Sequence, residues 1–234
     1  MALANLHSSK SGLTSPTSPF AEVGPNIIHD ISVTTLKEDV FRLMEDLRYL
    51  AALKTALTNS QTATLAKASI FDTQIHALEE RILSLRYTFC TMPSLGFTDQ
   101  FLNICCIAAS IIASVYFRNF NPELPALRTL KQDLTSAIEN IEALYGELKA
   151  IPDSETPYAE VLLWAFCAGG SLALKPSETT WFANRIIEVL PWTPVTNWLD
   201  AEASLKRTFW VDKMNNAACV ALWADVQGRF SLGT

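Results

Sequence analysis

The fold class of this chain is decided by residues 125–150, PALRTLKQDLTSAIENIEALYGELKA. Apolar side chains recur there at alternating intervals of three and four residues, namely Leu127, Leu130, Leu134, Ala137, Ile141, Leu144 and Leu148. This spacing places them on one face of an α-helix. We expect this apolar seam to face the protein's own core, and the docking of a partner helix is the alternative.

The same helical period continues on both sides of this segment. Helices are expected from Thr34 through Leu57 and over 62–89, 98–117, 157–174, 177–190, 195–212 and 215–226. Thr34 or Thr35 suits the first N-cap, and Ser177, followed by Glu178, suits that of helix 177–190. No stretch alternates with the period of a strand, and only 8 residues are glycine. The prediction is an all-α fold, an irregular helical bundle of about eight helices forming a single domain over residues 31–234.

Residues 1–30 differ from the rest in composition. They are rich in Ser, Thr and Pro and show no apolar periodicity, so they cannot bury enough surface to offset their ordering entropy. We expect a disordered, flexible tail in which Ser15 and Ser18, each followed by proline, are candidate phosphate acceptors. The tail lacks the charged and apolar regions of a signal peptide, so secretion is not expected.

The net charge and the cysteine content of the chain argue against further classes of protein. The chain has 18 basic and 24 acidic residues and a net charge of −6, whereas a module that grips nucleic-acid phosphates shows a basic excess. Direct nucleic-acid binding is therefore not expected. Five cysteines occur without a CxxC pair, in or beside apolar segments. They are interpreted as reduced core cysteines of an intracellular protein.

Motifs of catalysis are missing from the sequence, which contains no HExxH, GxSxG, GxGxxG or phosphate-binding loop. Gly169-Gly170 is interpreted as close helix packing or a helix end. Asp72, His76 and Glu80 share one helical face, but a di-metal bundle needs a second matching motif, so a solvated charged face is expected. We predict no enzyme activity and no catalytic, cofactor or metal residues.

Two apolar features of the sequence can each be interpreted in two ways. Residues 101–117, FLNICCIAASIIASVYF, carry no charge, but at about 1.5 Å per residue they fall short of a hydrocarbon core of about 30 Å. A central core helix is favoured over a membrane span, and no membrane partner is expected. All six tryptophans lie in the last third of the chain, where they indicate either an aromatic core or a ligand pocket.

Two segments of this region, LLWAFCAGGSLAL at 162–174 and ETTWFANRIIEVL at 178–190, carry a resemblance to a known family. They are followed in order by Trp198, Leu205-Lys206, Phe209-Trp210 and Leu222-Trp223, and preceded by AASIIASVYFRNFNPELP at 108–125. Over roughly residues 100–226, this order resembles the C-terminal regulatory domain of fungal binuclear zinc-cluster transcription factors. The resemblance implies an all-helical regulatory domain, a nuclear location and a role in a metabolic or biosynthetic gene cluster.

The chain departs from that family at its N-terminus. The family reads DNA through six cysteines that hold two zinc ions, but here the first cysteine is Cys90, and residues 1–30 contain one basic residue, Lys10. The chain is expected to be a truncated gene model or an accessory protein without its own DNA-binding module. It would act through a transcription-factor or co-regulator partner or a small-molecule effector. The alternatives are a cytoplasmic, all-helical small-molecule-binding protein or enzyme of a fungal metabolic pathway, and a helical adaptor.

Overall fold

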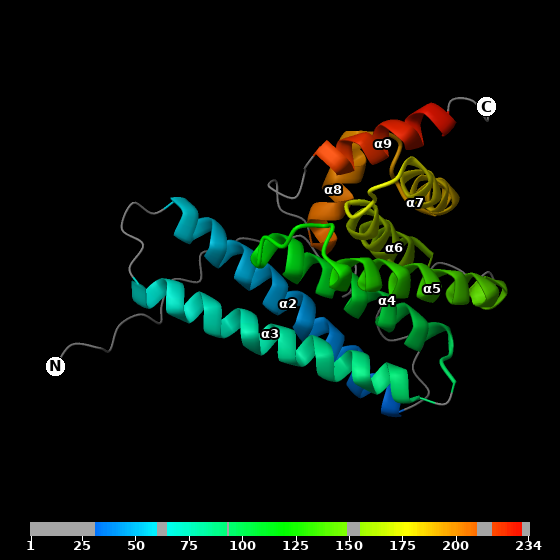
Figure 1. Ribbon diagram of the computed structural model, residues 1–234. Helices are drawn as coiled ribbons and strands as arrows, with labels where there is room; N and C mark the ends of the chain where they lie inside the picture. Colours follow the sequence, from blue (N-terminus) through cyan, green and yellow to red (C-terminus); the bar gives the residue numbers. More distant parts are fainter. Residues whose placement is uncertain (1–30, 60–64, 93, 149–154, 210–216, 231–234) are drawn as a thin grey trace, which may run out of the picture.

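The computed structural model describes residues 31–59, 65–92, 94–148, 155–209 and 217–230 (Figure 1). These ranges contain eight α-helices and no strand, which confirms the predicted all-α class. The helices are α2 (Ile31–Asn59), α3 (Leu65–Thr91), α4 (Phe97–Ile112), α5 (Pro125–Leu148), α6 (Glu155–Gly170), α7 (Pro176–Val189), α8 (Trp198–Thr208) and α9 (Ala217–Phe230). The predicted tail 1–30, with Ser15 and Ser18, lies outside the described residues.

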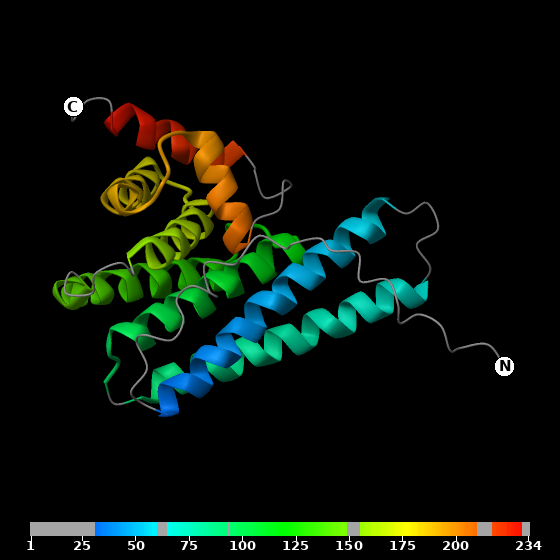
Figure 2. The same ribbon diagram turned by 180° about the vertical axis from the view of Figure 1, so that it is seen from behind.

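The helices form two groups that meet at α4 and α5. Helices α2 and α3 lie side by side as a long pair in both views, and the shorter α6, α7, α8 and α9 gather at the other side of the molecule (Figures 1 and 2). Helix α4 packs against α2, α3, α5 and α6. It is therefore the element around which the core is built.

The apolar composition of helix α4 matches its position in the core, where other helices surround it. Every residue from Ile104 to Ile112 is buried. Together with the π-helical turn η2 (Ala113–Phe117), it gives one stretch, Phe97–Phe117, that is long and apolar enough to cross a membrane by length and composition. In its most apolar window, 78% of the residues are buried inside the protein. Packing against four helices accounts for this composition within the fold.

The apolar seam of α5 faces the core over its described part. Leu127, Leu134, Ala137 and Ile141 are each at most 4% exposed, and Leu130 is partly buried against them. The side chains of Leu144 and Leu148 lie outside the description. Over the first half of the seam, the predicted core-facing orientation is confirmed.

Gly169 and Gly170 lie where α6 meets its neighbours. A Cβ added to Gly169 would be 2.6 Å from two ring atoms of Phe182 on α7 and 2.7 Å from a methyl group of Leu134 on α5. At Gly170 it would be 2.5 Å from a methyl group of Leu222 on α9. The interpretation as close helix packing is confirmed, since a side chain at Gly169 would separate three helices.

Three predicted helix starts are wrong in detail. Helix α2 begins at Ile31, so Thr34 and Thr35 lie inside it. Helix α7 is capped by Lys175 and has Pro176 at its first position, where the fixed φ of proline suits a helix start; Ser177 therefore falls within the first turn. The predicted helix 195–212 begins only at Trp198, because Asn197 accepts a hydrogen bond from the Asp200 amide and caps it.

Three predicted helix ends also differ from the structure. Helix α9 continues to Phe230, four residues beyond the predicted end at 226. Helix α6 stops at Gly170 instead of 174, where the amides of Leu172 and Ala173 bond three residues back and tighten the chain. Helix α8 ends at Thr208, since Phe209 is extended; residues 210–212 lie outside the description.

Candidate functional site

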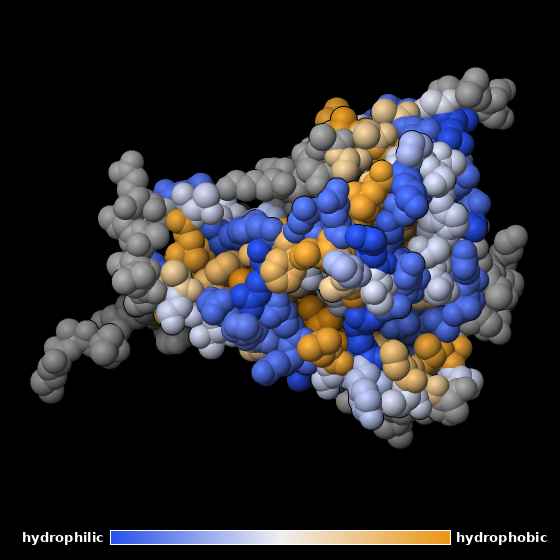
Figure 3. Space-filling model, in the orientation of Figure 1, coloured by the Kyte–Doolittle hydropathy of each residue, from blue (hydrophilic) through white to orange (hydrophobic). Residues whose placement is uncertain are grey.

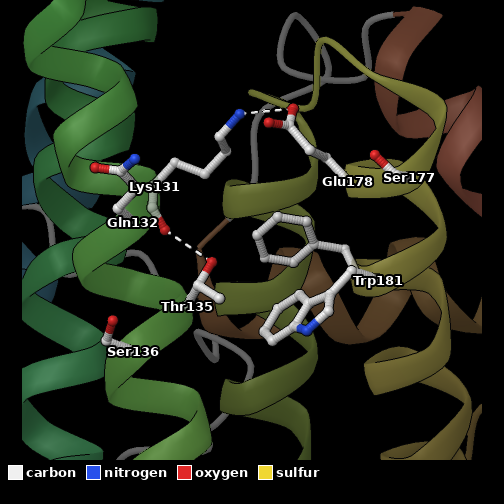
Figure 4. A pocket seen from close by; sticks show the side chains of 8 residues that line it. Lys131, Gln132, Thr135, Ser136, Ser177, Glu178 and Trp181 are labelled. Carbon is white, nitrogen blue, oxygen red and sulfur yellow. Dashed lines mark hydrogen bonds and ion pairs between the residues drawn. The ribbon is translucent and has the colours of Figure 1, made fainter.

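A groove opens between α5 and α7, with a volume of about 350 Å³ (Figure 4). Its walls are two matching sets of residues at successive helical turns, Lys131, Gln132, Thr135 and Ser136 on α5 and Ser177, Glu178, Trp181 and Phe182 on α7. We call this hollow the α5–α7 groove. Its volume lies within the range of about 300–1,000 Å³ that is typical of small-molecule sites.

The floor of the groove depends on the close approach of α6. Because Gly169 has no side chain, Phe182 and Leu134 both pack against its backbone. Phe182 is 1% exposed and Leu134 is fully buried. The distance between the two walls is therefore fixed by core packing rather than by flexible surface contacts.

One end of the groove carries a charged pair. Lys131 is only 8% exposed, and its Nζ lies 2.7 Å from Glu178 Oε2 and donates to the Leu172 carbonyl at 3.3 Å. The same carboxylate oxygen accepts the backbone amides of Leu174 at 2.9 Å and Lys175 at 3.3 Å. Glu178 thus holds the start of α7 and neutralises a nearly buried ammonium group.

Opposing effects act on the pKa of Glu178. Burial alone would raise it, but the hydrogen bond from Lys131, the charge of Lys131 and the two amides together lower it below its ordinary value of 4.5. The carboxylate is therefore ionised at neutral pH. Among the described residues, Lys131 has two partners for its three N–H donors, which leaves one donor for an acceptor bound at this end of the groove.

The other wall is aromatic. Trp181 and Phe182 of α7 supply its rings, and Figure 4 shows the Trp181 ring directed toward α5. The two rings meet edge to face with centroids 4.9 Å apart, and Arg185 lies 5.2 Å from the Trp181 ring centroid. On the α5 side, Thr135 donates its hydroxyl to the Lys131 carbonyl at 2.9 Å, and Gln132 and Ser136 are exposed at the rim. The arrangement suits a flat molecule that contacts Trp181 and presents an acceptor to Lys131.

The acidic cluster on α3 has a different role. Arg118, which follows η2, donates to Asp72 at 2.7 Å and to both Glu79 oxygens at 2.8 and 2.9 Å, and it lies 3.1 Å from His76 Nδ1. Hydrogen bonding to Glu79 raises the pKa of Arg118. Glu80 is exposed and, among the described residues, lies outside this network. Within the described residues, no three His, Cys, Asp or Glu side chains are placed to hold a metal ion.

Most described tryptophans belong to the core. Trp164 is fully buried and Trp223 is 5% exposed, while Trp181, Trp192 and Trp198 are partly buried against the core. Trp210 lies outside the description. The predicted aromatic core is confirmed for the described tryptophans, and Trp181 also lines the α5–α7 groove, so the alternative of a ligand pocket stays a prediction.

The part that Lys131 plays in the groove was not predicted from the sequence, although its position on the apolar seam could have indicated a buried charge. Lys131 lies four residues after Leu127 and three before Leu134, on the same face as the apolar seam. A lysine on a core-facing stripe needs a buried partner. The sequence does not show that this partner is Glu178, because the pairing depends on how α5 and α7 meet.

Comparison with known proteins does not assign this chain to a family. No family model matches the chain, and no match is found among curated proteins or among solved structures. The resemblance of residues 100–226 to a fungal regulatory domain stays a prediction.

Proposed function

We propose that this chain is a helical regulatory domain of the transcription-factor type, and that the α5–α7 groove is its effector site. The observation that carries the proposal is the groove itself. Its aromatic wall, Trp181 and Phe182, comes from the segment 178–190 that carries the family resemblance. A nearly buried Lys131 with one donor to spare completes the site.

The proposed effector is a small planar molecule with a hydrogen-bond acceptor. Its flat body would stack on or beside Trp181, and its acceptor would meet Lys131. Because Glu178 already neutralises Lys131, a carbonyl or amide oxygen suits the site as well as a carboxylate does.

In the cell, the proposed domain acts in the nucleus through a protein partner, either a transcription factor or a co-regulator. Its net charge of −6 is consistent with a protein that does not read DNA itself. A metabolic or biosynthetic gene cluster is the proposed target. On the face shown in Figure 3, the apolar surface of the described residues is broken into separate patches, so this face offers no broad apolar surface to a permanent partner.

Thermal unfolding with a panel of planar aromatic acids, amides and phenols tests the groove. Ligand at about 100 times its Kd stabilises the fold by about 2.7 kcal/mol and raises the Tm by several degrees. We expect Gln132→Trp, which places a large ring at the exposed rim, to abolish the shift.

The matched control is Glu139→Trp, at an exposed position one heptad further along α5. It should retain the full shift. A Tm rise that survives Gln132→Trp unchanged would place binding elsewhere, and the absence of a shift from any compound in the panel would contradict the proposed effector class.

A further inference from the structure

A second hollow lies in the C-terminal third, away from the α5–α7 groove. It has a volume of about 670 Å³ and lies between the link from α7 to α8 and the last turns of α9. Its apolar walls are Leu190, Pro191, Val195, Trp223 and Val226. We call it the C-terminal pocket. The described residues that line it and those that line the α5–α7 groove have no member in common.

The wall formed by the link is held rigidly by its own hydrogen bonds. The Thr193 amide and hydroxyl both donate to the Leu190 carbonyl, at 3.0 and 2.9 Å, within the short 3₁₀ turn η3 (Leu190–Trp192). The Thr196 amide and the Asn197 side chain both donate to Asp200, at 3.0 and 2.9 Å. A wall fixed in this way loses little conformational entropy when a ligand binds.

The opposite wall is equally fixed, because it belongs to the core. Trp223 is 5% exposed and Val226 is 1% exposed. The Trp223 ring packs against Trp198 with centroids 5.6 Å apart. Below this wall, Arg229 joins α9 to Thr180 of α7 at 3.0 Å. The pocket is therefore already formed in the absence of a ligand.

The lining offers very little to a charged ligand. Among the described residues that line the pocket, none is ionisable; the polar ones are Thr193, Thr196 and Gln227. Each threonine hydroxyl already donates its only proton, Thr193 to the Leu190 carbonyl and Thr196 to Asp200. Among these described residues, a bound anion would find neither a cation nor a threonine proton, and burying an unpaired charge is strongly unfavourable.

From this combination we infer that the C-terminal pocket binds a neutral, largely apolar small molecule. The pocket is large, its walls are preformed, and the described residues that line it are uncharged. The ligand gains affinity from burial against Trp223, Val195 and Val226 rather than from polar contacts. This site is separate from the proposed effector groove, so either one can fail without the other.

Titration of the intact protein with the neutral fluorescent probe N-phenyl-1-naphthylamine tests the inference. We expect saturable, blue-shifted fluorescence with one probe per chain. Decanol should displace the probe, and decanoate at pH 7.5 should be at least about tenfold less effective because its carboxylate finds no partner. No saturable binding, or equal competition by the alcohol and the acid, would overturn the inference.

Matched variants locate the site. Gln227→Trp places a large ring at an exposed position of the lining and should weaken probe binding by about tenfold or more. Val220→Trp, exposed on the same helix two turns earlier, should leave binding unchanged. Gln132→Trp in the α5–α7 groove should also leave it unchanged. Probe binding that is lost in Gln132→Trp but kept in Gln227→Trp would assign the probe to the groove and overturn the inference.

Discussion

At the scale of single residues, the absence of a side chain at a glycine can decide how closely two helices pack. Gly169 allows α5, α6 and α7 to approach one another, and this approach sets the width of the α5–α7 groove. Gly228, near the end of α9, has nothing within 4 Å of the position that a Cβ would take. The two helical glycines therefore form a natural comparison.

Replacing Gly169 by alanine should destabilise the protein. The new methyl group would lie 2.6 Å from the ring of Phe182, and overpacking of this kind costs about 1–3 kcal/mol, which outweighs a gain in helix propensity of up to about 1 kcal/mol. Gly228→Ala should instead be neutral or stabilising. Urea denaturation measures both, and equal effects of the two changes would contradict the packing account.

Cysteine reactivity should divide sharply between one exposed and four buried thiols. Cys90 is exposed, whereas Cys105, Cys106, Cys167 and Cys219 are buried. Burial raises the pKa of Cys106 and of Cys219 to about 12. With Ellman's reagent at pH 8, one thiol should react quickly in the folded protein and five in urea, because the thiolate is the reactive form. Cys90→Ser should remove the fast phase; a fast phase that persists would contradict this burial.

Glu178 should contribute a pH-dependent part of the stability. Its pKa is lowered in the folded state, so the ionised carboxylate stabilises the fold at neutral pH, and this contribution is lost as the pH falls through the folded-state pKa, below 4.5. Glu178→Gln should cost about 1–2 kcal/mol at pH 7, and the difference from the wild type should shrink below about pH 4. Urea denaturation at pH 7, 5 and 3.5 measures it; a constant difference would contradict the sign.

At the scale of the elements, the two groups of helices are joined by a polar contact as well as by the core. Arg48 on α2 donates to the carbonyls of Arg207, at 3.0 Å, and Thr208, at the end of α8. Arg207 in turn pairs with Glu160 on α6, whose side chain is only 7% exposed. A cation at a helix C-terminus also interacts favourably with the helix dipole.

Arg48→Met should release the end of α8. The loss of hydrogen bonds from a charged donor costs about 1.5–3 kcal/mol, and amide hydrogen exchange in α8 should accelerate more than that in α3. Arg42→Met, at an exposed position of the same helix, should stay within about 0.5 kcal/mol of the wild type. Equal acceleration in α3 and α8 would show that the contact is not local to α8.

The positions of the helices could be predicted from the sequence because periodicity is a local property. The seam from Leu127 to Ile141 is an example, since each apolar residue lies at a spacing that only a helix places on one face. Exact ends were less predictable. The ends of α6 and α8 depend on a tightened turn after Gly170 and on an extended Phe209, which the apolar pattern does not encode.

At the scale of the whole molecule, the site could not be predicted, because it depends on contacts between distant segments. The sequence marks Trp181 as one of six clustered tryptophans, but it does not show which residues of α5 face it across the groove. Arg118 was likewise missed as the partner of Asp72 and Glu79, since it lies beyond η2, far from α3 along the chain. Local spacing grouped Asp72 with Glu80, whereas the fold selects Glu79.

The central proposal is that the α5–α7 groove is the effector site of a domain that regulates transcription. Its most direct test is a comparison of transcript profiles in the native host among the wild type, a strain without the gene, and strains carrying Gln132→Trp or the control Glu139→Trp. We predict that deletion and Gln132→Trp change the same set of transcripts, while Glu139→Trp changes none. Unaltered transcript levels in the deletion strain would contradict the claim.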